Sequence, residues 1–194
     1  MKTKAVRLYG ENDLRLEEFE LPEIKDDEIL ARVVSDSICM SSYKAALQGA
    51  NHKRVPKDIA TNPVIIGHEF CGDIIKVGAK WQHLFKAGMK FGIQPAMNLK
   101  ENPYIAPGYS YVNIGGDATY VIIPNEVMES DCLIPYEGES YFKASLAEPM
   151  SCIIGAYHAQ YHTTNGVYVH DMGIKKGGNL AILAGAGPMG LGAI

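Results

Sequence analysis

The first 123 residues contain many short apolar runs, and turn-forming residues end nearly all of them. The clearest runs are residues 4–8, 29–34, 64–66, 74–77 and 118–123, bounded by Gly, Pro, Asn or Asp. Runs this short with this punctuation are typical of β-strands. Many short strands separated by turns favour a partly open β-barrel. The sequence therefore predicts a mostly β fold over residues 1–140.

The pattern changes near residue 141, where apolar residues begin to recur at helical spacing. This spacing predicts one long amphipathic helix that runs into the segment between His158 and His162, with Pro149 kinking it or lying near its start. Residues 179–184 then predict a buried strand. One strand and the start of a helix cannot form a doubly wound sheet. We therefore expect residues 141–194 to be a linking helix and the truncated beginning of a Rossmann domain.

Three glycines follow the predicted strand, Gly185, Gly187 and Gly190, in the spacing G-x-G-x-x-G. After a buried strand and before a helix, this spacing indicates a dinucleotide-binding loop. The first glycine permits the tight turn, the second lets a pyrophosphate approach, and the third allows close packing of the helix on the sheet. An ordinary strand–helix turn is the alternative. No residue in the chain distinguishes NAD from NADP, so both remain open.

His68 and Glu69 lie between glycines, Gly67 and Gly72, and between two apolar runs. Imidazole, carboxylate and thiolate are ligands of a catalytic zinc ion, which keeps its fourth position open. Cys39 is the candidate thiolate upstream. Glu148, downstream on an otherwise apolar helical face, is a second candidate carboxylate, since a buried carboxylate needs a partner or a metal.

Two other interpretations of these histidines remain open. His68 and Glu69 would form a solvated pair in a surface turn if the flanking runs were not buried. His158 and His162 lie one helical turn apart in the predicted helix and would chelate a metal there, although positions on the helix surface are the more ordinary interpretation.

Four motifs together resemble the zinc-dependent medium-chain alcohol and polyol dehydrogenases, in their GroES-like catalytic domain and the first strand of their Rossmann domain. The resemblance covers nearly the whole chain. Its motifs are Cys-Met-Ser-Ser at 39–42, Gly-His-Glu at 67–69 with Gly72, Ala-Glu-Pro-Met-Ser at 147–151, and the loop at 185–190.

The resemblance implies a role for each position. Cys39 and His68 match direct zinc ligands, and Glu69 matches the carboxylate beside the metal. Glu148 matches the sorbitol-dehydrogenase branch, in which glutamate replaces a ligand cysteine. Ser41 matches the hydroxyl that passes on the substrate proton. One thiolate and one carboxylate balance the charge of Zn²⁺, so we expect Glu69 and Glu148 to bind with unequal strength.

The implied reaction is hydride transfer between a polyol, sugar alcohol or sugar phosphate and NAD or NADP. Within the family, residues 39–44 and the basic loop of His52, Lys53 and Arg54 are most similar to the sorbose-1-phosphate reductases. Residues 94–116 contain no cysteine, so we expect one catalytic zinc and no structural zinc. The full-length protein is expected to be a homodimer or homotetramer, and the truncated chain alone to be inactive.

Composition limits the other function classes. A net charge of -4 without a large basic cluster argues against nucleic acid as a partner. No apolar run has the length of a membrane span or a signal peptide, and four single cysteines are typical of free thiols, so we expect a cytoplasmic protein. The alternative function is a non-catalytic GroES-like fragment or a zinc-less relative of the quinone-reductase type. A zinc-less relative should lack Cys39, His68 and Glu148.

Overall fold

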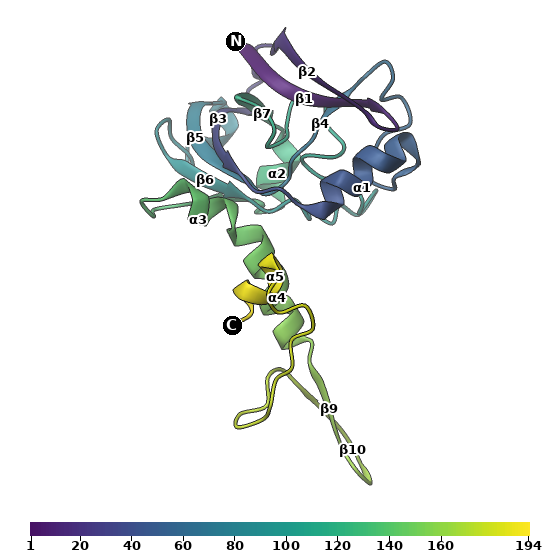
Figure 1. Cartoon of the computed structure of the whole chain (residues 1–194). Coiled ribbons are helices and arrows are strands. Elements are labelled where there is room, and N and C mark those ends of the chain that lie inside the picture. The colour runs from purple at the N-terminus through teal and green to yellow at the C-terminus, as the bar shows by residue number, and fades with distance from the viewer. The chain divides into compact units, whose positions relative to one another are not determined.

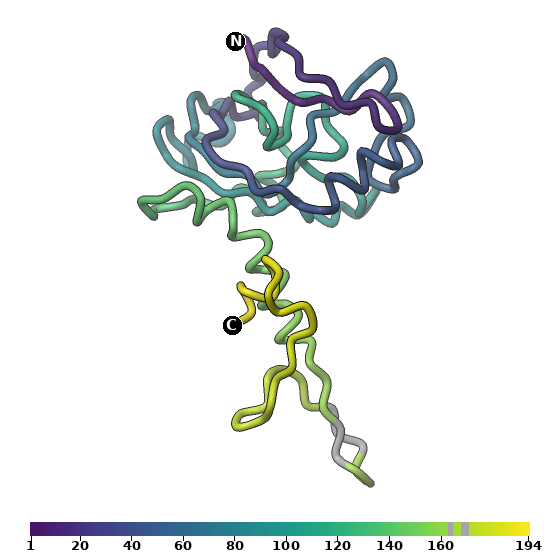
Figure 2. Tube along the Cα trace, viewed as in Figure 1, coloured from purple at the N-terminus to yellow at the C-terminus, as the bar shows by residue number. Residues whose placement is uncertain are grey.

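The computed structural model covers all 194 residues and describes the side chains of residues 1–162, 165–167 and 171–194. Figure 2 draws the path of the chain with these residues in colour. The chain divides into two compact units, Met1–Leu146 and Ala147–Ile194. Among the described residues, no helix combines the length and the apolar character that a membrane span requires.

The first unit is built from two antiparallel sheets (Figure 1). The three-stranded sheet has the order β2-β1-β4, with β1 at Lys2–Gly10, β2 at Asp13–Glu20 and β4 at Val64–Ile65. The five-stranded sheet has the order β7-β3-β5-β6-β8, with β3 at Ile29–Asp36, β5 at Phe70–Val77, β6 at Lys90–Ile93, β7 at Tyr120–Ile123 and β8 at Leu133–Pro135. A single bridge between Ala5 and Ala118 links strand β1 to the segment before β7. The mostly β fold with open sheets is confirmed.

Three hydrophobic clusters hold this unit together, and the two larger ones surround the strands and helix that matter for the site. The larger of these two covers the five-stranded sheet, and in it the rings of Phe70 and Phe91 meet edge to face with their centroids 6.1 Å apart. The smaller of the two joins the three-stranded sheet to α1 (Met40–Gln48) and includes Leu8, Ala45 and Tyr109. Burial of these side chains therefore fixes α1 against β1, which matters because α1 begins directly after Cys39.

Short helices complete the first unit. They are the 3-10 turns η1 (Gly49–Asn51) and η2 (Ala79–Trp81) and the helices α2 (Asn125–Glu129) and α3 (Tyr141–Ser145). The predicted long helix is α4, which spans Ala147–His158 with Pro149 near its start, whereas Tyr141–Ser145 forms the separate helix α3. Pro149 explains the break: its ring would clash with the carbonyl of Ser145 in a continuous helix, whereas in the first turn of α4 its missing N–H costs nothing.

The second unit contains α4, a hairpin of β9 (Tyr161–Thr164) and β10 (Val167–Met172), and α5 (Pro188–Gly192). The hairpin replaces the predicted end of the long helix. Asn165 and Gly166 form its two-residue loop, and Gly166 has a φ of 75°, as such turns require. Residues 179–184, predicted as a strand, are irregular, and Leu183 is 94% exposed. A buried strand needs neighbours for its backbone groups, and no described strand pairs with this segment.

Candidate metal centre

The turn between β4 and β5 carries His68 and Glu69 and is held from both sides. The carbonyls of Ile66 and Gly67 accept hydrogen bonds from the backbone N–H groups of Asp117 and Gly116, at 3.0 and 2.7 Å. Gly67 has a φ of 91°, a conformation that residues with a side chain rarely adopt. This backbone geometry directs His68 and Glu69 into the interior, where they are only 4% and 6% exposed.

Cys39 reaches the same place from the other direction. It is the residue that precedes α1, so the packing of α1 against β1 fixes its position. The ligand atoms of Cys39, His68 and Glu69 all lie within 4.8 Å of one another. Among the side chains that the structure describes, these three form the one group of at least three His, Cys, Asp or Glu residues close enough to share an ion. The structure thus brings together three of the four predicted metal ligands.

The donor set fits zinc. A thiolate sulfur and an imidazole nitrogen around a tetrahedral Zn²⁺ ion are about 3.5 Å apart, so only small movements would complete the site. Burial, and next the positive charge of Arg54, lowers the pKa of His68 to about 4. Its ring is therefore neutral near pH 7 and has a lone pair for a metal. Nε2 of His68 lies 3.9 Å from Oε1 of Glu69. Nδ1 of His68 lies 3.2 Å from the Ser42 hydroxyl, which can accept a hydrogen bond from the Nδ1–H group.

Ser41, predicted as the catalytic hydroxyl, lies directly at this cluster. Its Oγ is 3.0 Å from the Cys39 sulfur and 3.2 Å from Nε2 of His68. It accepts a hydrogen bond of 2.7 Å from the hydroxyl of Tyr109, whose oxygen is also 3.2 Å from the same His68 nitrogen. Sequence reasoning missed Tyr109, because it lies in an irregular stretch whose residues carry no periodic signal.

A half-buried pair of carboxyl groups, Asp36 and Asp117, lies beside the turn. Oδ1 of Asp36 accepts the backbone N–H of Glu69 at 3.2 Å. Burial, and next the charge of Asp117, raises the pKa of Asp36 to about 8, and burial raises the pKa of Asp117. Near pH 7 Asp36 is therefore mostly a neutral acid that supports the Glu69 backbone. This pair was also missed, since neither aspartate lies in a recognisable motif.

The remaining predicted site residues lie in the second unit. Glu148 is in the first turn of α4, and Cys152, one turn later, lies with its sulfur 3.6 Å from Oε1 of Glu148. His158 ends α4 while His162 lies on β9, with Nε2 2.8 Å from the carbonyl of Gly173. The helical pairing of these two histidines, considered as an alternative metal site, is therefore wrong.

The glycine-rich loop leads into α5. Gly187 precedes the helix, and a Cβ atom on Gly190 would lie 2.5 Å from the Cα of Gly185. The loop thus needs glycine where its two ends approach each other. Binding of a dinucleotide by Gly185, Gly187 and Gly190 stays a prediction, as does zinc ligation by Glu148.

The comparisons with known proteins identify the domain that carries this site. Residues 25–132 match the alcohol dehydrogenase GroES-like domain. L-Sorbose 1-phosphate reductase from Klebsiella pneumoniae is 59% identical over 192 residues, covering 99% of this chain and 47% of that protein. Mannitol-1-phosphate 5-dehydrogenase from Aliivibrio fischeri is 55% identical over 193 residues, covering 100% of this chain and 45% of that protein. The chain spans a little under half the length of these two relatives.

A solved structure gives the same fold. The 2R,3R-butanediol dehydrogenase of Bacillus subtilis is similar with a TM-score of 0.64 and 26% identity, over 80% of this chain and 46% of that one. The match covers most of the barrel that positions Cys39, His68 and Glu69.

Proposed function

The chain belongs to the medium-chain zinc alcohol dehydrogenase family through its GroES-like domain, and we propose that it forms the metal-binding part of an enzyme that transfers hydride between a polyol or sugar phosphate and NAD or NADP. The observation that carries the proposal is the convergence of Cys39, His68 and Glu69, with the hydroxyl of Ser41 at hydrogen-bond distance from two of them.

The substrate class comes from two of the relatives that match nearly the whole chain. Their names describe enzymes acting on sorbose 1-phosphate and mannitol 1-phosphate. Both compounds are phosphorylated six-carbon chains with secondary alcohol or carbonyl carbons. We infer a substrate of this class for the present protein, with the reacting oxygen at the open side of the cluster, where half-buried Cys39 approaches the surface.

Each residue of the cluster has a distinct task in this proposal. Cys39, His68 and one carboxylate hold the ion, and a zinc ion there would supply Lewis-acid polarisation of the substrate oxygen. Ser41 accepts the proton of the substrate hydroxyl as its own hydroxyl proton passes on to solvent. Tyr109 orients the Ser41 oxygen by donating a hydrogen bond to it. Gly185 and Gly187 let the pyrophosphate of the dinucleotide approach the backbone.

Formal charge argues against equal binding by two carboxylates. The Cys39 thiolate and a single carboxylate neutralise Zn²⁺, and a second carboxylate would make the site anionic and any bound water less acidic. We propose that one of Glu69 and Glu148 is the closer ligand, and that the other is the weaker or exchanging one.

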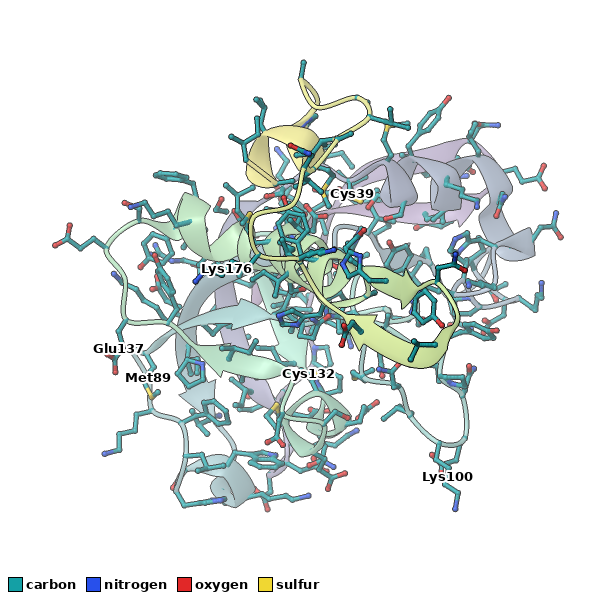
Figure 3. All side chains as sticks on the ribbon, turned by 90° about the horizontal axis from the view of Figure 1, so that it is seen from below. Cys39, Met89, Lys100, Cys132, Glu137 and Lys176 are labelled. Atoms are coloured by element: carbon teal, nitrogen blue, oxygen red, sulfur yellow. The ribbon has the colours of Figure 1, made fainter. Side chains whose placement is uncertain are left out.

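Zinc content tests the proposal. The purified chain is expected to hold about one zinc per chain, and Cys39→Ala is expected to lose it, because two remaining ligands bind zinc far more weakly. Cys132→Ala is the matched control, since Cys132 is a thiol on another part of the barrel (Figure 3). Zinc retained by Cys39→Ala would contradict the site. Glu69→Gln and Glu148→Gln, measured alongside, identify the closer carboxylate as the one with the larger loss of affinity.

In the full-length protein, Ser41→Ala is expected to keep zinc and to lower the turnover number for hydride transfer by about 10²- to 10⁴-fold, because proton transfer loses its acceptor. Tyr109→Phe, which removes only the hydroxyl that orients Ser41, is expected to cause a smaller loss. Steady-state kinetics with a hexitol phosphate and the nicotinamide cofactor measure both. Normal turnover by Ser41→Ala would exclude Ser41 from the proton path.

A further inference from the structure

Positive charge is concentrated beside the metal cluster, around the ring of Tyr109. The guanidinium carbon of Arg54 lies 5.6 Å from the centroid of that ring. The centroid of the His68 ring lies 4.7 Å from the same Tyr109 centroid. Because both distances end at Tyr109, at most about 10 Å separate the guanidinium carbon from the His68 ring.

Two further cations, Lys44 and Lys53, lie near the same group of rings. Buried His52 stacks on Tyr109 with 5.8 Å between ring centroids, and its pKa is lowered by burial first and then by the charges of Arg54, Lys44 and Lys53. His52 itself is therefore neutral near pH 7. The ammonium of Lys53 lies 4.7 Å from the ring centroid of Tyr104. The charges of Arg54, Lys44 and Lys53 thus all act on the ring of His52, which stacks on Tyr109.

Arg54 differs from the other arginines of the chain. The sequence has four, and the other three, Arg7, Arg15 and Arg32, each form an ion pair with an aspartate or glutamate. No carboxylate whose side chain the structure describes forms an ion pair with Lys44, Lys53 or Arg54. In a protein of net charge -4, such a group of cations without a paired carboxylate is suited to an anionic ligand.

The backbone around Arg54 is fixed before any ligand binds. Its N–H donates to Nδ1 of His52 at 3.3 Å, and its carbonyl accepts the Ser110 hydroxyl at 2.6 Å. Its Nη1 donates to the carbonyl of Tyr104 at 3.1 Å. A guanidinium has five N–H donors in a planar fork, so most of them remain for a ligand with several acceptor oxygens. Phosphate is the group whose geometry this fork matches.

We propose that Arg54, assisted by Lys53, binds the phosphate of a phosphorylated substrate whose reacting carbon lies at the Cys39–His68–Glu69 cluster. This inference rests on the proposed function, which supplies the reacting end. The hydrogen bond between the guanidinium and a phosphate oxygen takes up about 2.8 Å of the distance between Arg54 and the His68 ring. A short phosphorylated carbon chain spans the rest. The phosphate then selects phosphorylated hexitols over free ones.

Ligand binding to the zinc-loaded chain, measured by calorimetry, tests this subsite. Mannitol 1-phosphate is expected to bind more tightly than mannitol, and Arg54→Gln is expected to weaken only the phosphorylated ligand, by about tenfold or more. Lys57→Gln is the matched control, because it removes the same charge from the same loop while its ammonium donates to the carbonyl of Ala50. Exposed Lys53→Gln, which should not disturb folding, is expected to cause a smaller loss in the same direction.

Three results would overturn the subsite. They are equal or undetectable binding of both ligands, an equal loss in Lys57→Gln and Arg54→Gln, and a loss for mannitol as large as for its phosphate. Adenosine 2′-phosphate distinguishes the source of the phosphate: dependence on Arg54 for this probe alone would assign the loop to NADP instead. Zinc content of the same samples separates the two proposals, since a chain without zinc that still binds the phosphate through Arg54 fails only the proposed function.

Discussion

Gly67→Ala is expected to disrupt the turn that carries His68 and Glu69 and to abolish zinc binding. A Cβ atom at this position would lie 2.2 Å from Oδ2 of Asp36 and 2.6 Å from the backbone nitrogen of Asp117. The Asp36 carboxyl accepts the Glu69 N–H and the Asp117 nitrogen donates to the carbonyl of Ile66, so neither group can move aside without weakening the turn. A left-handed φ costs a residue with a side chain about 1–2 kcal/mol, and overpacking adds about 1–3 kcal/mol. We therefore expect the free energy of unfolding to fall by about 3 kcal/mol.

Gly88→Ala is the matched control for that experiment. Gly88 has a φ of 86°, close to the 91° of Gly67, but a Cβ atom there would meet nothing within 4 Å. This variant should lose only the conformational part, about 1 kcal/mol, and keep its zinc. Denaturant unfolding and zinc content measure both variants. Equal losses of stability would show that close packing of the turn against Asp36 and Asp117 contributes nothing.

The three clustered ligands could be predicted because their chemistry is local in the sequence. His68 and Glu69 are adjacent between two strands, and Cys39 is the residue before a helix, so each motif carries its own structural context. Tyr109 and Asp36 could not be predicted in the same way. Tyr109 reaches Ser41 across 68 positions, and Asp36 reaches the backbone of Glu69 across 33. Only packing of the two sheets and the irregular loops creates such contacts.

The errors in the second unit have different causes. Apolar spacing up to residue 162 hid one local signal, the Asn165–Gly166 turn, which closes the hairpin of β9 and β10. Pro149, expected to kink the helix or to lie near its start, lies in the first turn of α4. The segment at 179–184 has the composition of a buried strand, but composition cannot supply the neighbouring strands that would accept its backbone hydrogen bonds. In this unit, turn-forming residues therefore predict the observed elements better than hydrophobic periodicity does.

Asp36→Asn is expected to flatten the dependence of stability on pH between about pH 5 and pH 8. In the folded chain the pKa of Asp36 is about 8, because of burial and the nearby charge of Asp117, whereas in the unfolded chain it is about 4. Between these values the folded state holds a proton that the unfolded state has lost. The contribution of Asp36 is therefore fully present below about pH 4 and is lost as the pH rises towards 8, with a slope of at most about 1.4 kcal/mol per pH unit.

Asparagine keeps the oxygen that accepts the Glu69 N–H and cannot ionise, so the variant should be at least as stable as the parent at pH 8. His68 acts in the opposite direction, since its lowered pKa makes stability rise between about pH 4 and 6.5, but it is present in both proteins and cancels in the difference. Unfolding curves should be recorded with a chelator, because zinc affinity adds its own pH dependence. Asp13→Asn, at an exposed carboxylate paired with Arg15, should leave the slope unchanged. An unaltered slope in Asp36→Asn would mean that the half-buried carboxyl is already ionised near neutral pH, and the negative charge would then lie directly beside the backbone of Glu69.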